Sequence, residues 1–195
     1  MDDKYLPAIY TGFALGIAFL GWRIDNAYYL QLLIFIGLNT LLALSLNMLM
    51  GYAGQISLGH AAFYGIGAYV TAIMSTTYQV PPLLALPAAV GAAMVIAWIV
   101  GMPTLRLSGY YLGMGTLGFG MIVHIVLREW GSVTGGASGF VGIPPLEIGP
   151  VSFASSKSYF FLVWAVVLAV IILCRRIIDS RVGRALCAIH DGEKA

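Results

Sequence analysis

Apolar segments alternate with short polar connections along nearly the whole chain. About six of these runs are each long enough to cross a bilayer, which needs roughly 20 helical residues. Between Asn26 and Leu105 there is no Lys, Arg, Asp or Glu, so this region cannot form the surface of a water-soluble domain. The pattern predicts an all-α, polytopic bundle of transmembrane helices over about residues 5–22, 27–50, 51–74, 83–102, 110–127 and 158–174.

The third run is unusual because glycine and polar residues interrupt it over Gly51–Tyr69. This stretch contains five glycines together with Gln55, Ser57 and His60. Irregular polar backbone is tolerated at membrane depth only where protein buries it or where it lines a cavity. We expect the first half to be broken and the second half to be a helix capped by Ser57, with free N–H groups that suit a substrate carboxylate. The pattern is compatible with a re-entrant segment and with part of a full span.

Two interpretations of this third run compete. The spacing of Gly59, Phe63 and Gly67 is typical of a close crossing between helices. The functional alternative is a translocation route, because buried polar side chains need a partner, water or a ligand. For His60 we expect a hydrogen-bonded buried histidine rather than a proton relay.

The fifth run has a similar character. It carries five glycines between Leu105 and Gly120, too many for a stable isolated helix, because each costs about 1 kcal/mol relative to alanine. The likeness indicates either a degenerate duplicated unit or, as we expect, two helices that must pack closely. Thr116 is the natural polar contact within this run. The candidate residues of a substrate pathway are therefore Gln55, Ser57, Gly59, His60 and Thr116.

Composition and charge support the membrane class and orient the chain. Charged residues make up 9% of the sequence, hydrophobic residues 60%, and the mean hydropathy is +0.91. Five of the ten Lys and Arg residues follow Cys174, which predicts that this end faces the cytoplasm. Counting back over six spans places Arg106 and the N-terminus in the cytoplasm and the 128–157 loop outside.

Residues that catalysis or metal binding requires do not occur at plausible spacing. There are no paired carboxylates, metal-ligand cluster or Ser/His/Asp set, so we expect no enzyme activity, no cofactor and no metal. Cys174 and Cys187 are expected to be reduced thiols. Thr134-Gly-Gly lacks the continuation of a phosphate-binding loop and follows no strand, so we expect no nucleotide binding there. We also expect no nucleic-acid partner. The 128–157 loop is then a turn-rich connection, a gate or a docking surface for an external binding protein.

The C-terminal tail predicts an amphipathic helix on the cytoplasmic side. It occupies residues 175–195, after a transmembrane domain over 1–174. Such a helix lies on anionic lipid or docks on a cytoplasmic partner. Its apolar residues recur at helical spacing, with charges on other faces: Ile178, Val182, Ala185, Leu186 and Ile189.

Four motifs together carry a resemblance to a known family. They are residues 46–69 (LNMLMGYAGQISLGHAAFYGIGAY), 105–120 (LRLSGYYLGMGTLGFG), 134–144 (TGGASGFVGIP) and 179–193 (DSRVGRALCAIHDGE). With these motifs the chain resembles the permeases of branched-chain amino acid ABC importers, in particular the LivM-like subunits. The resemblance covers about residues 40–195.

The resemblance implies a multi-pass protein of the bacterial cytoplasmic (inner) membrane that works in a heteromeric importer. The implied partners are a second permease subunit, two cytoplasmic ATPase subunits, a periplasmic or external amino-acid-binding protein and the lipid bilayer. It also implies that the tail leads into the ATPase-coupling loop, with Arg181, Arg184, Leu186 and Ile189 as coupling residues. Cys187 and His190 depart from the family, where basic residues are common at these positions.

Family members continue with further spans beyond the position of Ala195. The resemblance therefore implies the N-terminal part of a permease with an incomplete coupling loop, which we expect to insert but not to support uptake alone. One rival function is a permease of the same superfamily for a sugar, nucleoside or urea-like solute. A rival of another class is a channel, which would conduct without ATP, or an intramembrane enzyme, which would need acidic or metal-binding residues inside a span.

Overall fold

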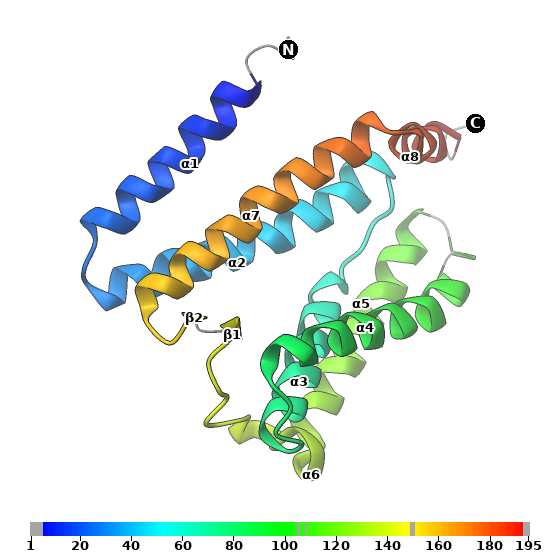
Figure 1. Cartoon of the computed structure of the whole chain (residues 1–195). Helices are drawn as coiled ribbons and strands as arrows, with labels where there is room; N and C mark the ends of the chain where they lie inside the picture. The colour runs from blue at the N-terminus through cyan, green and yellow to red at the C-terminus, as the bar shows by residue number, and fades with distance from the viewer. Residues whose placement is uncertain (1–5, 105, 108, 149–150, 193–195) are drawn as a thin grey trace.

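The computed structural model describes residues 6–104, 106–107, 109–148 and 151–192, and most of this part is helical (Figure 1). The predicted all-α, polytopic helix bundle is confirmed. A π-helical turn at Met48–Tyr52 and a 3-10 turn at Gly136–Ser138 supplement the main elements. These are α1 (Leu6–Arg23), α2 (Ala27–Asn47), α3 (His60–Thr76), α4 (Pro82–Thr104), α5 (Gly109–Glu129), α6 (Gly131–Thr134), β1 (Glu147–Ile148), β2 (Val151–Ser152), α7 (Ser156–Asp179) and α8 (Arg181–Gly192).

Four of the described helices are long and apolar enough to cross a membrane: α2 with its π-helical turn, α4, α5 and α7. Helix α1 follows the first predicted run but is not among these four. Helix α3 has only 17 residues, because the glycine-rich half of the third run is not helical. Large apolar side chains such as Trp98 and Ile122 are 65% and 62% exposed, as expected of surfaces that face lipid or other transmembrane helices.

Two groups of helices make up the bundle (Figure 1). In the first group α1 and α2 both pack against α7, and in the second α3 packs against α4 and α5. In Figure 1 the start of α1 lies at the top of the view, α8 at the upper right and the end of α4 at the right. The α1–α2 turn lies at the left of the view and α6 at the bottom, with the β1–β2 hairpin between them. The topology predicted from charge likewise puts the N-terminus, the α4–α5 connection and the C-terminal tail on one side of the membrane and the loop between α5 and α7 on the other.

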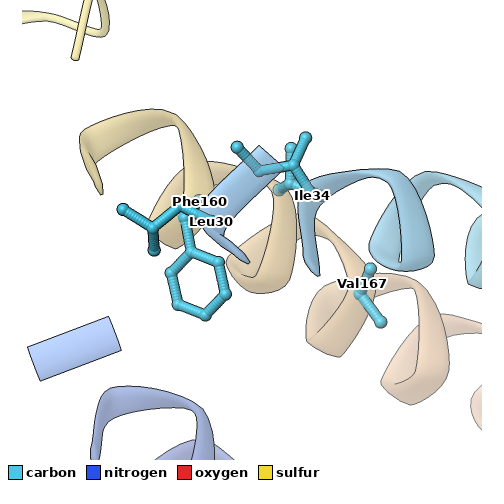
Figure 2. Packing of buried hydrophobic residues seen from close by; sticks show 5 residues of the cluster. Leu30, Ile34, Phe160 and Val167 are labelled. Atoms are coloured by element: carbon cyan, nitrogen blue, oxygen red, sulfur yellow. The ribbon is translucent and has the colours of Figure 1, made fainter. Parts of the chain in front are cut away.

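The core of the first group lies between α2 and α7 (Figure 2). Leu30 and Ile34, four residues apart on α2, meet Phe160, Val163 and Val167 on α7. Their spacings of three and four residues place each set on one helix face. Phe160 and Val167 are fully buried. The apolar face is therefore continuous along the contact.

Two glycines allow the helices of this group to approach closely. A Cβ on Gly37 of α2 would lie 2.7 Å from Val163 Cγ1. A Cβ on Gly21 of α1 would lie 2.6 Å from Phe161 Cζ and 2.7 Å from Phe160 Cε1. Small residues serve this purpose in membrane bundles, where association depends on packing rather than on exclusion of water.

An ion pair joins the α1–α2 turn to the first turn of α7. Lys157 Nζ donates a hydrogen bond to Asp25 Oδ1 at 2.7 Å. This hydrogen bond, together with the ammonium charge, holds the pKa of Asp25 below its usual range. Both side chains are substantially exposed, so the pair positions the turn more than it stabilises the fold.

Two details differ from the sequence-based prediction. Helix α7 continues to Asp179, five residues beyond the expected end of the sixth run, because charged residues such as Arg175 are good helix formers and need no burial. Arg175 also pairs with Asp179 at 3.6 Å along the helix. The loop before α7 contains the β1–β2 hairpin, whose strands of two residues each give no alternating pattern in the sequence.

The core predicts a difference between two adjacent phenylalanines. Phe160 is fully buried, whereas Phe161 is 40% exposed. Phe160→Ala is expected to lower the free energy of unfolding by about 2–4 kcal/mol, because it leaves a cavity between α2 and α7. Phe161→Ala is expected to cost less than about 1 kcal/mol, since lipid or detergent replaces the ring. Thermal unfolding in detergent measures both, and equal losses would contradict the assignment of the core.

The grouping of ends predicts opposite labelling of two thiols. Ser138 lies in the exposed turn after α6, and Cys187 is exposed on α8. In intact cells an impermeant maleimide is expected to label Ser138→Cys and not Cys187, because the charge asymmetry predicts that the arginine-rich end faces the cytoplasm. Two proteins are compared, one with Ser138→Cys and no Cys187 and one that keeps Cys187, and Cys174 is replaced in both. Permeabilised cells serve as the control. Equal labelling of both sites in intact cells would overturn this topology.

Candidate functional site

An unwound segment separates α2 from α3. After the π-helical turn, residues 53–59 form no helix, and Gly54 has a φ of 69°, in the left-handed region. The Gln55 N–H donates to the Leu49 carbonyl at 3.2 Å, which closes the turn. The expected break in the first half of the third run is therefore confirmed. Interrupted helices of this kind line substrate sites in transporters.

The predicted start of the helix at Ser57 is wrong. Helix α3 begins at His60, and Gly59 occupies the cap position without any side-chain cap. The reason is the contact that Gly59 makes with α5, which keeps the chain out of the helical conformation for two more residues. Ser57 is buried, at 8% exposed, and caps nothing.

Segment 56–59 crosses α5 at a distance that only glycine permits. A Cβ on Gly59 would collide with the backbone carbonyl of Thr116, and a Cβ on Gly120 would lie 3.2 Å from the Gly59 Cα. Gly113 faces Ile56, whose Cγ2 would lie 3.0 Å from an added Cβ. Gly113, Thr116 and Gly120 are three and four residues apart, so they form one face of α5.

Thr116 supplies the polar contact at this crossing. Its Oγ1 accepts a hydrogen bond from the Leu58 N–H at 3.0 Å and donates to the Gly113 carbonyl at 3.0 Å. A backbone N–H in apolar surroundings is costly when it has no partner. Thr116 therefore stabilises the unwound segment. The sequence analysis predicted that Thr116 makes a polar contact, but it did not identify the Leu58 N–H as the partner.

The structure decides between the packing interpretations of the glycines. Nothing lies within 4 Å of a Cβ on Gly67, so the interpretation in which Gly59 and Gly67 share one close helix face is wrong for the described part of the chain. Gly59 makes the close approach from the unwound segment, not from a helix. The contact between the third and fifth runs favours close packing as the reason for their shared composition.

His60 is hydrogen-bonded, as expected. Its Nε2 lies 2.7 Å from the Ser45 Oγ on α2, and this hydroxyl also donates to the Leu42 carbonyl at 2.9 Å. His60 thus joins α3 to α2 rather than to Thr116. Gln55 is half-buried, and within the described residues neither its side chain nor that of Ser57 has a hydrogen bond. The part of these residues in a substrate pathway stays a prediction.

An open cleft of about 770 Å³ lies between α3 and α5. Gly59 lies in its lining, whereas Gln55, Ser57, His60 and Thr116 are not among the described lining residues. The lining also includes Tyr69, His124 and Arg128, which the sequence analysis did not select. The available signal was the four-residue spacing of His124 and Arg128, which places them on one face of α5. The remaining lining residues are apolar or glycine: Leu58, Ala61, Ala62, Gly65, Leu117, Gly120, Met121, Val123, Ile125, Leu127, Gly136 and Ala137.

A sharp break separates α7 from α8. Ser180 is extended, and its hydroxyl accepts a hydrogen bond from the Val182 N–H at 3.1 Å. A Cβ on Gly183 would collide with the Ile178 carbonyl, so glycine is required where the chain turns. The predicted stripe that joined Ile178 to Val182 in one helix is therefore wrong, because Ile178 belongs to α7.

The predicted coupling residues lie on α8, which packs against the π-helical turn. Arg181 and Arg184 are exposed, and Leu186 is half-buried. The side chain of Ile189 lies outside the described part of the structure. Helix α8 thus presents two exposed guanidinium groups and one half-buried leucine that a partner could contact.

Comparisons with known proteins point to one family. Residues 28–195 match the family model for the branched-chain amino acid transport system / permease component. The high-affinity branched-chain amino acid transport system permease protein LivM of Salmonella typhimurium (strain LT2) is 38% identical over 116 residues, which are 60% of this chain and 27% of that protein. LivM of Escherichia coli (strain K12) is 41% identical over 104 residues, 53% of this chain and 24% of its own length. The chain therefore covers about a quarter of these relatives, and no solved structure gives a significant match.

The crossing predicts different outcomes for two glycines. Gly59→Ala is expected to lower the free energy of unfolding by about 2–3 kcal/mol, because the added Cβ meets a backbone carbonyl that cannot rotate away. Gly67→Ala places a Cβ in open space within a helix and is expected to be neutral or slightly stabilising. Thermal unfolding in detergent compares them, and a neutral Gly59→Ala would refute the close crossing.

Proposed function

Because the chain belongs to the family of branched-chain amino acid permease components, we propose that it forms part of the membrane pathway of an ATP-driven importer for branched-chain amino acids. The observation that carries this proposal is the unwound segment held against α5, beside an apolar cleft, within a chain matched over residues 28–195.

The chemistry of the cleft suits such a substrate. A branched side chain gains from contact with small and aliphatic groups such as Ala61, Ala62 and Leu117. The ammonium and carboxylate groups need polar partners, which unwound backbone supplies in transporters. We include Gln55, Ser57, Gly59, His60 and Thr116 in the pathway as residues of, or adjacent to, the unwound segment and its crossing.

We assign α8 to the cytoplasmic side, where it approaches the ATPase. Arg181 and Arg184 supply charges that orient docking, while Leu186 and Ile189 supply apolar contact. The proposed assembly contains a second permease subunit, two ATPase subunits and an external binding protein in the bacterial inner membrane. ATP hydrolysis belongs to the ATPase subunits in this assembly, and this chain carries no catalytic role.

Reconstitution tests the function directly. The permease that carries this sequence is combined in proteoliposomes with its partner permease, the ATPases and the binding protein. We expect leucine uptake that requires both ATP and the binding protein, and no uptake by the 195-residue chain alone. Gly59→Leu should reduce uptake at least about tenfold, because the side chain separates the unwound segment from α5.

The outcomes separate the rival functions. Uptake of a pentose, nucleoside or urea in place of leucine would support a different permease of the superfamily. Leucine flux without ATP would indicate a channel. Normal leucine uptake by Gly59→Leu, in a correctly assembled importer, would remove the crossing from the pathway.

A further inference from the structure

Among the described residues that line the α3–α5 cleft, one carries a permanent charge. Arg128 occupies the last turn of α5, and His124 lies one helical turn before it on the same face. Tyr69 of α3 provides a third polar group. The cleft is therefore apolar along most of its length and cationic at the end near α6.

Arg128 has no ion-pair or hydrogen-bond partner for its side chain among the described residues. A guanidinium at the edge of an apolar cleft gains most from an anion, and its planar group pairs with a carboxylate through two parallel hydrogen bonds. An arginine in the last turn of a helix is also a common interfacial anchor. Arg23 holds that position in α1 without lining the cleft, so it offers a matched comparison.

The loop after α6 forms a defined edge beside Arg128. Thr134 is 2% exposed, and its hydroxyl donates to the Trp130 carbonyl at 2.8 Å and accepts from the Gly136 N–H at 3.2 Å. Gly136 has a φ of 60°, and a Cβ there would lie 3.4 Å from the Arg128 carbonyl. The glycine thus lets the loop rest against the end of α5, where Gly136 and Ala137 complete the lining.

We propose that Arg128 binds the carboxylate of the transported amino acid at the α6 end of this cleft, while the aliphatic lining receives the branched side chain. This inference rests on the proposed function. It adds that a charged residue of the permease itself, and not only the external binding protein, recognises the carboxylate. Arg128 is thereby a determinant of specificity for amino acids over uncharged solutes.

The test uses the reconstituted importer with leucine as the probe. Arg128→Gln is expected to lower leucine uptake at least about tenfold, the effect of losing a charge-assisted hydrogen bond. The ATPase activity that the leucine-loaded binding protein stimulates should stay within about twofold, because the coupling surface is unchanged. The ATP hydrolysed per leucine transported should therefore rise about tenfold, which a general loss of structure would not produce. Arg23→Gln is the control and should leave uptake and ATPase activity unchanged.

A second variant separates charge from folding. Arg128→Cys is prepared with Cys174 and Cys187 replaced, and is then modified with a cationic or an anionic methanethiosulfonate. The cationic reagent should restore uptake at least about threefold over the unmodified variant and the anionic reagent should not, since a carboxylate needs a positive partner.

Each outcome decides the proposal. Uptake by Arg128→Gln within twofold of wild type, or equal effects of the two reagents on assembled Arg128→Cys, would overturn it. An importer with wild-type Arg128 that transports no leucine would instead remove the proposed function.

Discussion

The contact of Gly59 with the backbone of α5 is the constraint on which the second group of helices depends. It places an unwound stretch of polar backbone inside an apolar bundle, where each free N–H is costly. The Thr116 hydroxyl satisfies one of these groups at Leu58, and the absence of side chains on Gly59 and Gly120 allows the approach. The start of α3 and the position of the cleft both follow from this contact.

The helices within each group are held together by a different kind of contact. Large side chains interlock between α2 and α7, with Phe160 and Val167 fully buried. Where the start of α3 and the segment before it meet α5, the closest contacts involve glycine and main chain, together with one hydrogen bond and the ring pair Phe63–Phe119. Interlocked side chains resist sliding, whereas a glycine contact offers few atoms to interlock. The contact between α3 and α5 therefore resists sliding less than the contact between α2 and α7 does.

Helix α8 contacts the π-helical turn that precedes this crossing in the chain. It packs against the π-helical turn at Met48–Tyr52, and the unwound segment begins directly after that turn. π-helical turns inside helices are frequent at functional sites, because they interrupt the regular hydrogen bonding. A displacement of α8 would thus act on the residues that lead to Gly59, with no intervening helix to absorb it.

Local sequence determined the class of this protein and the approximate extent of its helices. Hydropathy marks a span wherever it lies, and the break in the third run was evident from glycine and polar residues that a lipid-facing helix excludes. The glycine clusters of the third and fifth runs also indicated close packing. The resemblance carried by four motifs indicated the permease family, which the family model over residues 28–195 confirms.

Tertiary structure alone decided which residues meet. The bond between Leu58 and Thr116 joins positions 58 residues apart, and it explains why α3 begins at His60 and why Gly59, not Gly67, makes the close approach. The sequence analysis placed Arg128 at the start of the 128–157 loop. Its place in the cleft could not be predicted, because the opposite wall is α3, which is far away in the sequence. The break at Ser180 was equally hidden, since helical spacing continues through it. Periodicity reports the face of a residue within one element, but it does not say what lies opposite that face.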